Sequence, residues 1–445
     1  MCYLCPGTSV THVPSLYTSP KKVTKERRPQ AAAPSGSPNK REPKREAKRT
    51  RPSGSDMFRF FIRFGSRLFG SVPADERQLL GTRPAWCLKN CIGWLAYLLI
   101  VFSSIAFAAP PQFSPVLPDS PLTFPRDFGA HPDFRIEWWY ATGWLETPDK
   151  KPLGFQITFF RSATEHDADN PSRFAPRQLI IAHAAIFDHA VGRLLHDQRS
   201  ARQGFDLAYA REGNTDVKLD DWRLVRGDDG QYRAIIKARD FTLELSLTPS
   251  QAPLPQGDGG FSRKGPKPEQ ASYYYSEPHL QVTGTVVRNG KRVKVSGTAW
   301  LDHEWSTSVL DPDAAGWDWI GINLDDGSAL MAFRIRGKSG DKLWAHAALR
   351  DKSGRLKQFA PDQVEFIPQR NWRSPRTNAT YPVAMRIRTG DMTWELNPLQ
   401  DDQELDSRQS TGAVYWEGAV TVTRDGRPAG RGYLEMTGYV KPLKL

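Results

Sequence analysis

Hydrophobic and polar residues alternate with a period of two along much of the chain after residue 130. The segment 241–247, Phe-Thr-Leu-Glu-Leu-Ser-Leu, shows this most clearly, because an extended strand would place its apolar side chains on one face. Residues 109–445 contain no amphipathic helical pattern of three turns, so the sequence predicts an all-β fold. We predict strands at 137–145, 155–160, 179–187, 232–238, 241–247, 280–287, 293–300, 317–324, 329–335, 344–349, 384–387, 393–396, 414–423 and 432–440.

Turn dipeptides separate many of these predicted strands. Asn289-Gly290 is the strongest hairpin signal, since both residues tolerate the positive φ angles of a tight type I′ turn. The composition changes near Asp311-Pro312-Asp313, and each half supplies about eight strands, the number that closes a small barrel around one ligand. We therefore predict two consecutive antiparallel β-barrels, at 120–306 and 312–445.

Two connections are long for a compact domain. Residues 162–177 are polar, and residues 251–270 are rich in proline and glycine with a small positive charge. Loops of this length are usually lids over a site or disordered segments, and we expect one or the other in each case.

The first 108 residues differ from the rest in charge and hydropathy. They hold 18 of the 61 basic and 6 of the 49 acidic residues, which leaves 43 of each for 109–445. A basic, disordered leader at 1–91 precedes an apolar signal segment at 92–108, and alanines at 106 and 108 fit a signal-peptidase site. We predict an exported protein of the periplasm or cell envelope. An uncleaved anchor in the inner membrane is the alternative, although a spanning helix needs ~20 apolar residues.

The leader also accounts for the net charge of +12, which therefore does not indicate a nucleic-acid partner. The cysteines lie in the leader too, at positions 2, 5, 87 and 91. A mature chain of 337 residues is long enough to be stabilised by its core without disulfides. Both Met1 and Met57 are possible starting residues.

Aromatic residues gather at the start of the first half, after the second long connection and around the junction of the halves. Consecutive aromatic residues on a strand must face both sides of the sheet, and one side of a closed barrel is its lumen. An aromatic lumen would suit a long apolar or conjugated ligand, whereas simple core packing is the alternative. The predicted ligand-binding residues are Glu137, Trp138, Trp139, Tyr140, Tyr275, Trp300, Trp317 and Trp319.

The segment 300–305, Trp-Leu-Asp-His-Glu-Trp, is the densest cluster of reactive side chains. On an extended strand Asp302 and Glu304 point one way, while His303 and Trp305 point the other way. A carboxyl group among indoles would have a raised pKa and would donate a proton near neutral pH. We predict these four residues as catalytic, and a structural network at the domain junction is the alternative.

Metal and cofactor sites have little support in the sequence. Glu137, His183, His279 and Glu304 would have to converge to bind a metal ion, and their spacing matches no dense ligand motif. The chain also lacks a nucleophile elbow, a phosphate-binding loop and a dinucleotide fingerprint. We expect no metal and no cofactor.

Several segments in the right order resemble the carotenoid 1,2-hydratase (hydroxyneurosporene synthase) and AttH-like family of two-domain lipocalin-type proteins. They are Glu137-Trp-Trp-Tyr140 with Gly143, Tyr274-Tyr-Ser-Glu-Pro278, Gly297-Thr-Ala-Trp-Leu-Asp-His-Glu-Trp305, Gly316-Trp-Asp-Trp-Ile320 and Leu324-Asp-Asp-Gly327. The resemblance covers roughly 124–440. It implies two calycin-like barrels, often exported and sometimes found beside transporter permeases.

The resemblance also implies two functions between which the sequence leaves a choice. Hydratases of this group add water to an isoprenoid double bond without a cofactor, and the family's His-x-Trp pair matches His303 and Trp305. The family's second pair, Tyr-x-Asp, has no equivalent at 329–335. We therefore favour an exported protein that binds an isoprenoid or lipid, with a transporter permease as a possible partner. A hydratase, or a secreted hydrolase, is the alternative.

Overall fold

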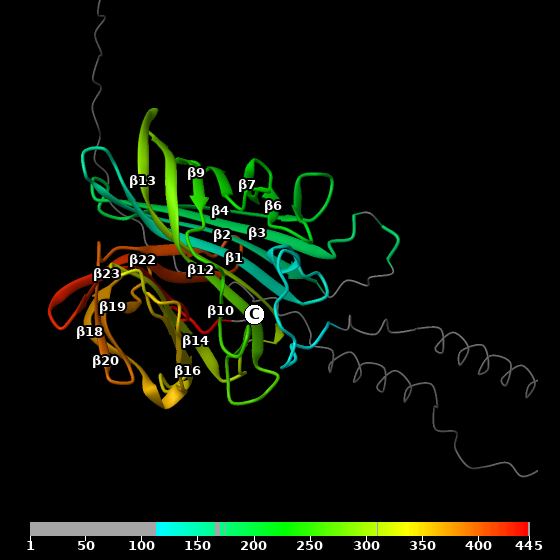
Figure 1. The fold of residues 1–445 in the computed structure, drawn as a ribbon. Helices are drawn as coiled ribbons and strands as arrows, with labels where there is room; N and C mark the ends of the chain where they lie inside the picture. The colour runs from blue at the N-terminus through cyan, green and yellow to red at the C-terminus, as the bar shows by residue number, and fades with distance from the viewer. Residues whose placement is uncertain (1–112, 165–169, 173, 309, 444–445) are drawn as a thin grey trace, which may run out of the picture. The chain divides into compact units, whose positions relative to one another are not determined.

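The computed structural model describes residues 113–164, 170–172, 174–308 and 310–443. The strands of these residues form two antiparallel sheets (Figure 1). The first sheet contains β1 (Ile136–Glu146), β2 (Pro152–Ala163), β3 (Gln178–Asp188), β4 (Leu194–Arg202), β5 (Ala208–Ala210), β6 (Asp216–Leu219), β7 (Trp222–Arg226), β8 (Tyr232–Lys237), β9 (Thr242–Thr248), β10 (Leu254–Pro255), β11 (Phe261–Arg263), β12 (Ala271–Arg288) and β13 (Lys291–Ser308). The second contains β14 (Ala314–Leu324), β15 (Ala329–Gly337), β16 (Lys342–Arg350), β17 (Leu356–Phe359), β18 (Val364–Arg373), β19 (Thr380–Thr389), β20 (Met392–Pro398), β21 (Glu404–Ser407), β22 (Ala413–Arg424) and β23 (Arg427–Met436).

The strand order confirms the all-β prediction. The first sheet runs β4-β3-β2-β1-β13-β12-β9-β8-β7-β6-β5, with β10 and β11 paired to β12. The second runs β17-β16-β15-β14-β23-β22-β20-β19-β18, with β21 paired to β22. The sheets curl, so that β5 and β6 lie against β3 and β18 lies against β15 and β16. The chain passes from one sheet to the other between β13 and β14.

The hairpin between β12 and β13 forms where the sequence predicts it. Arg288 pairs with Lys291, and the two residues between them, Asn289 and Gly290, have φ angles of 50° and 73°. Positive φ at both central residues is the mark of a type I′ turn, whose twist matches that of the flanking strands. The turn therefore fixes the register of the two 18-residue strands from the turn to the pair Leu280 and Ala299, and an irregularity between Glu277 and Leu280 separates this stretch from the segment that carries Asp302.

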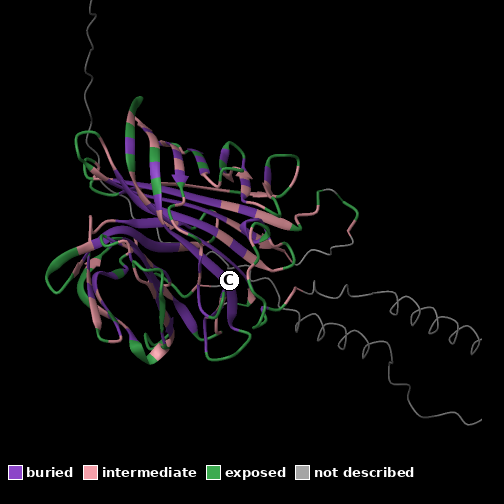
Figure 2. Cartoon of the chain, in the orientation of Figure 1, coloured by how far each residue is buried: buried purple, intermediate pink, exposed green. Residues whose placement is uncertain are grey.

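Each sheet encloses a core formed by one face of its strands. Trp139 and Ala141 of β1 point into the first core, and Ile320 and Ile322 of β14 point into the second. The opposite faces of the same strands are also buried (Figure 2), because a third apolar cluster between the sheets includes Tyr140. The sheets approach closely at Gly154, where an added Cβ would lie 2.9 Å from the Cβ of Ala419.

The connection at 251–270, called the strap below, differs from the sequence expectation of a lid or a disordered segment. Its short strands β10 and β11 pair with β12. The Gln358 side chain of the second sheet donates a hydrogen bond to the Gly257 carbonyl, and the Arg350 side chain donates one to that of Ala252. Backbone pairing therefore holds the strap in place. Residues 165–169 and 173 of the other long connection are not described.

Helical structure in the described part of the chain consists of two 3-10 turns, Arg126–Phe128 and Pro361–Gln363. None of the helices in this part has the length and the apolar character that crossing a membrane would require. The predicted leader at 1–91 and signal segment at 92–108 lie outside the described residues.

Candidate functional site

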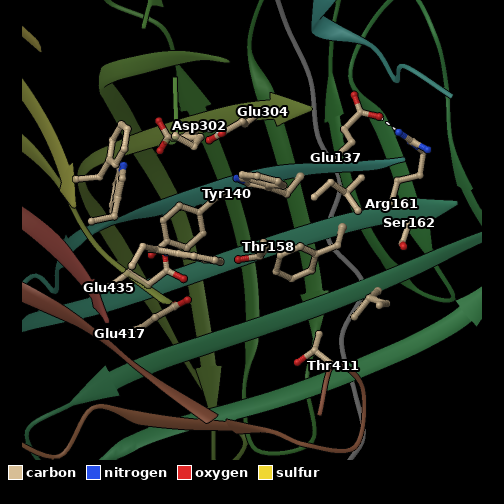
Figure 3. A pocket seen from close by; sticks show the side chains of 18 of the residues that line it. Glu137, Tyr140, Thr158, Arg161, Ser162, Asp302, Glu304, Thr411, Glu417 and Glu435 are labelled. Carbon is tan, nitrogen blue, oxygen red and sulfur yellow. Dashed lines mark hydrogen bonds and ion pairs between the residues drawn. The ribbon is translucent and has the colours of Figure 1, made fainter. Parts of the chain in front are cut away.

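A cavity of about 360 Å³ lies between the outer faces of the two sheets (Figure 3). It is lined from the first sheet and the strap by Ile136, Glu137, Trp138, Tyr140, Thr158, Phe160, Arg161, Ser162, Ile181, Lys264, Asp302 and Glu304, and from the second half by Trp317, Trp319, Phe333, Ile335, Ser410, Thr411, Glu417 and Glu435. The sequence suggested a barrel lumen as the ligand space, whereas this cavity lies outside the interiors of the two sheets. Large side chains such as Trp139 and Trp416 fill the interiors of the two sheets, whereas their outer faces leave space between them.

Asp302 of β13 reaches the wall of this cavity. Its carboxyl group accepts hydrogen bonds from the Tyr274 hydroxyl at 2.7 Å, the Ser276 hydroxyl at 2.6 Å and the Trp300 indole N–H at 2.6 Å. Burial raises the pKa of Asp302 to about 7, although the three donors act in the opposite direction. Near neutral pH the carboxyl group therefore exists in both protonation states, as a general acid requires.

Glu304 faces the same cavity two residues further along β13. The strap supplies its partner, because Nζ of Lys264 lies 2.9 Å from Oε1 of Glu304 and both side chains are nearly fully buried. The Lys264 ammonium also lies 4.5 Å from the centre of the Tyr274 ring and 4.3 Å from that of Phe333. The strap thus brings a cation to the site from a segment distant from β13 in sequence.

Glu417 of β22 and Glu435 of β23 line the cavity from the second sheet. They are directly opposite each other in the antiparallel pairing, and both carboxyl groups point toward the cavity (Figure 3). Burial raises the pKa of Glu417 well above its usual range, and the charge of Glu435 raises it further. Burial also raises the pKa of Glu435. The Trp317 indole donates a 3.1 Å hydrogen bond to this carboxyl group, which acts in the opposite direction.

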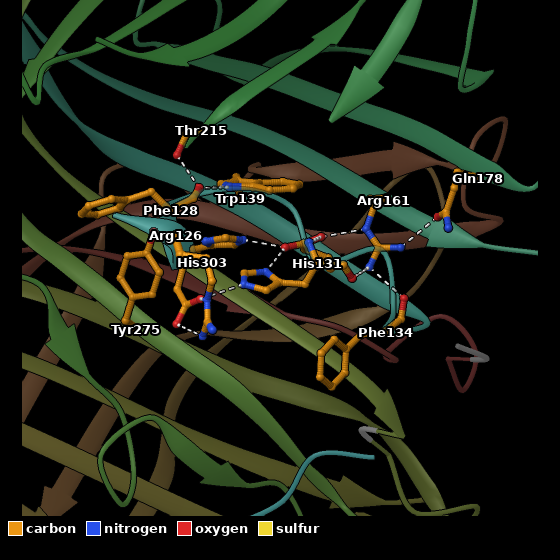
Figure 4. Close-up of polar contacts among 12 residues, drawn as sticks. Arg126, Phe128, His131, Phe134, Trp139, Arg161, Gln178, Thr215, Tyr275 and His303 are labelled. Carbon is orange, nitrogen blue, oxygen red and sulfur yellow. Dashed lines mark hydrogen bonds and ion pairs between the residues drawn. The ribbon is translucent and has the colours of Figure 1, made fainter. Parts of the chain in front are cut away.

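A second polar network surrounds Glu137, which also lines the cavity, and Figure 4 shows His131, Arg161 and His303 of this network. Oε1 of Glu137 lies 2.7 Å from Nδ1 of His131 and 2.9 Å from Nε2 of His303. Oε2 accepts a 2.7 Å hydrogen bond from Nε of Arg161. Burial acts to raise the pKa of Glu137, but these hydrogen bonds and the nearby positive charges hold it well below its usual range. Glu137 is therefore a buried carboxylate anion.

The pKa values of the two histidines of this network are shifted in opposite directions. Burial lowers the pKa of His303 to about 4, so its ring is neutral, with Nε2 donating to Glu137 and Nδ1 accepting from the Tyr275 hydroxyl at 3.1 Å. Burial opposes protonation of His131 too, but hydrogen bonds to Asp127 and Glu137 raise its pKa. The His131 ring stacks on Trp305 with centres 3.6 Å apart, an arrangement in which the indole face stabilises the protonated imidazole.

His131, Glu137 and His303 also have the geometry of a metal-ligand set, with one ligand atom of each within 4.8 Å of the others. A divalent ion there would have to displace protons from both histidines and would stand next to the Arg161 guanidinium. Since Arg161 already neutralises Glu137, the donor set does not fit a metal. The four residues considered from the sequence do not converge: His183 contacts Tyr415 and Ser410, His279 contacts the Ser328 carbonyl, and Glu304 pairs with Lys264.

Ser410, another residue of the cavity wall, lies 2.8 Å from Nε2 of His183 through its hydroxyl oxygen. The same hydroxyl is 2.7 Å from Oε1 of Gln198, which competes for its proton. Burial lowers the pKa of His183 to about 3, so this imidazole is a weak base. The pair lacks the activation that a nucleophilic serine needs.

The predicted site residues fall into two groups, those that line the cavity and those that do not. Those that line the cavity are Asp302, Glu304, Glu137, Trp138, Tyr140, Trp317 and Trp319, and those that do not are His303, Trp305, Trp139, Tyr275 and Trp300. Trp300 still contacts the site through its hydrogen bond to Asp302. Sequence reasoning missed Lys264, Glu417 and Glu435. The signal for the two glutamates was present, because each is a lone acidic residue within an otherwise apolar strand, at 413–420 and at 432–436.

Comparison with known proteins finds a matching family model and solved structures with a similar fold. The model of a protein family described as AttH-like matches residues 115–439. A crystal structure of a protein from Nitrosomonas europaea, assigned as AttH, is similar to 74% of this chain and 100% of its own, with 67% sequence identity and a TM-score of 0.70. Kievitone hydratase from Nectria haematococca has the same fold, with 13% identity, a TM-score of 0.56 and coverage of 75% and 98%.

A shorter stretch of this chain is similar in sequence to part of an enzyme. The acyclic carotenoid 1,2-hydratase of Rubrivivax gelatinosus is 32% identical over 92 residues. The match spans 20% of this chain and 22% of the hydratase, so it relates a part of each protein.

Proposed function

The chain belongs to the AttH-like family, and on this premise we propose that it is a cofactor-independent hydratase that adds water to a double bond of a long apolar isoprenoid. The observation that carries the proposal is Asp302, a buried carboxyl group with a pKa of about 7 in the wall of an aromatic cavity. The local match to a carotenoid 1,2-hydratase supports the same reaction class. We place the reaction between the sheets, with Asp302 in the role of proton donor.

The residues around Asp302 suit the charge that such a reaction develops. Protonation of a trisubstituted alkene leaves a tertiary cation, and the faces of aromatic rings stabilise a desolvated cation by ~2 kcal/mol or more. Trp319 and Tyr140 line the cavity close to Asp302, because Trp319 donates a hydrogen bond at 3.1 Å to the hydroxyl of Tyr274, which in turn donates to Asp302. Their contribution is greater in the transition state than in the ground state, which is the condition for catalysis.

The network around Glu137 supports the site without taking part in the reaction. His303 and Trp305 lie on the far side of β13 from the cavity, so we assign them to positioning rather than to the catalytic role that the sequence suggested. Their stacking against Trp139 and His131 fixes the strand from which Asp302 projects.

A carrier that binds an isoprenoid or lipid without changing it is the second candidate, and the apolar wall of the cavity favours it. The buried carboxyl groups favour the enzyme, because a simple apolar ligand gives no reason to bury Asp302 and the two glutamates. A serine hydrolase has less support, since His183 is a weak base beside Ser410.

The proposal predicts that the purified protein hydrates an acyclic carotenoid without any added cofactor. Lycopene in detergent micelles is a suitable substrate, and the product would be followed by chromatography and by the mass gain of one water. Lycopene that is retained but never hydrated would favour the carrier. Lycopene that is neither bound nor hydrated would contradict both versions.

We further propose that the protein is exported and that its mature form begins at Ala109, with a transporter permease as a partner in the cell envelope. The support is the apolar run at 92–108 and the alanines at 106 and 108. N-terminal sequencing of protein from the envelope fraction is expected to read from Ala109. Recovery of a chain there that still starts at Met1 or Met57 would mean that the segment is retained.

A further inference from the structure

Hydration needs a second group besides the proton donor, because the attacking water must lose a proton. The group has to reach the cavity and must be ionised when Asp302 is protonated. Asp302 acts from the first sheet, so a base on the second sheet would face the opposite side of the bound alkene. Glu417 and Glu435 are carboxyl groups of the second sheet that line the cavity.

The placement of these two glutamates favours one shared negative charge over two. They are directly paired across β22 and β23, and such partners have Cβ atoms about 4.5–5.5 Å apart. Glu417 is 1% exposed, and among the described residues no Lys, Arg or His forms an ion pair with either glutamate. Two neighbouring buried anions without a cation repel each other strongly, so the first ionises and the second retains its proton.

Unsatisfied polar atoms indicate that the pair faces something other than protein. Oε2 of Glu417 and the Tyr140 hydroxyl are buried without a hydrogen-bond partner, and both residues line the cavity. Tyr140 is drawn between Asp302 and the two glutamates in Figure 3, and its hydroxyl lies within the electrostatic influence of both glutamates. Buried polar groups without partners are rare in native proteins, and here they surround a space in which a water molecule or a hydroxyl group of a ligand fits.

The other charged groups near the pair do not remove its shared proton. Asp302 and Glu304 on β13 and Asp318 on β14 are acidic, and their charges raise the pKa of Glu435. Lys264 of the strap is paired with Glu304. Tyr433 of β23 and Tyr415 of β22 are buried phenols that stay neutral, because burial raises the pKa of each well above its usual range.

We propose that Glu417 and Glu435 share one proton and form the base that deprotonates the attacking water, opposite Asp302. This inference rests on the proposed hydratase function. Asp302 transfers its proton to one alkene carbon, and the π bond breaks to leave a cation on the other. A water oxygen bonds to that cation and passes one proton to the anionic member of the pair. One proton must then return from the pair to Asp302, and the Tyr140 hydroxyl between them or a water molecule can carry it.

The test separates the two steps by running the reaction with lycopene in D₂O. In the double variant E417Q/E435Q, Asp302 still protonates the alkene, but the second sheet keeps no carboxylate to accept the proton of water. The cation then returns a proton from a neighbouring carbon to the Asp302 carboxylate, so we expect deuterium to enter the recovered alkene while alcohol formation falls by ~10²-fold. Each single variant keeps one ionised carboxylate and should form alcohol at a rate between those of the wild type and the double variant. Formation of alcohol by the double variant at the wild-type rate would overturn the proposal.

A matched control is available inside the first sheet. Burial raises the pKa of Glu277 to about 7 as well, but this residue accepts a hydrogen bond from Tyr232 and does not line the cavity. E277Q should therefore retain both deuterium exchange and alcohol formation. Equal loss of alcohol in E277Q and in E417Q/E435Q would assign the effect to a general loss of structure.

A titration without substrate tests the shared proton directly. With ¹³C-labelled glutamate, NMR of the wild-type protein should show one carboxyl group of the pair still protonated above pH 7, and E435Q should lower the pKa of Glu417. Titration of both glutamates near the ordinary value of about 4.3 would overturn the proposal even if the enzyme is active. An inactive wild-type protein would instead contradict the proposed function, and the titration would still decide whether the proton is shared.

Discussion

Replacement of Asp302 by asparagine is expected to lower the rate of hydration by ~10²-fold or more, because asparagine keeps the shape of the side chain but has no acidic proton to donate. The amide oxygen of asparagine can accept from Ser276 and Trp300, which both bond to Oδ1 of Asp302, and its NH₂ group can donate to the Tyr274 hydroxyl, so the wall of the cavity should be preserved. The measurement is the initial rate of alcohol formation from lycopene. Binding of lycopene, followed by quenching of tryptophan fluorescence, should change little in the same variant.

The pH dependence follows from the same carboxyl group. Its pKa is raised to about 7 and its protonated form donates the proton, so Asp302 should give the pH profile a limb along which the rate falls as the pH rises through that value. D302N should lack this limb of the profile. A D302N protein that hydrates lycopene at the wild-type rate would remove Asp302 from the mechanism.

Replacement of Glu137 by glutamine is expected to lower the free energy of unfolding by about 3–5 kcal/mol, because it removes the anion of a fully buried ion pair and leaves the Arg161 guanidinium uncompensated. His131 loses a carboxylate partner at the same time. Urea unfolding at pH 7 measures the loss. The matched control is Glu146→Gln at the end of the same strand, whose pair with the exposed Lys150 should contribute less than ~1 kcal/mol. Equal losses in the two variants would contradict the assignment of Glu137 as the centre of the network.

The contribution of this network to the free energy of unfolding should decrease both at low pH and at high pH. The folded-state pKa of Glu137 is depressed, so its contribution is present above the unfolded value near 4.3 and is lost as the pH falls through the folded value. The folded-state pKa of His131 is raised, so its contribution is full below about 6.5 and is lost as the pH rises through the folded value. In Glu137→Gln, the free energy of unfolding should change less with pH at both the acidic and the basic end.

Local sequence patterns predicted much of the architecture. The alternation at 241–247 became β9, and Asn289-Gly290 became the turn between β12 and β13. These predictions succeeded because a period of two and a positive φ angle are properties of a few neighbouring residues. The same reasoning placed Asp302 and Glu304 on one face of β13 and His303 and Trp305 on the other, as the structure has them.

Local sequence patterns could not predict the location of the site. Alternation along β1 separates Trp139 from Tyr140 but does not say which side is a filled core and which side faces an open cavity. That depends on how the two sheets pack against each other. The sequence led us to the lumen, whereas bulky residues fill the lumen and the cavity lies between the sheets.

By itself, then, the sequence determined the family, the all-β fold and the acidic strand that carries Asp302, because these depend on short-range periodicity, turn chemistry and motifs of adjacent residues. Tertiary structure alone decided that Lys264 pairs with Glu304, that Glu137 gathers Arg161 and two histidines, and that Glu417 meets Glu435. The physical reason is that the pKa of a buried carboxyl group is set by its desolvation and by charges within a few ångströms. Residues from distant segments supply both, through strand pairing and sheet packing that no local pattern encodes.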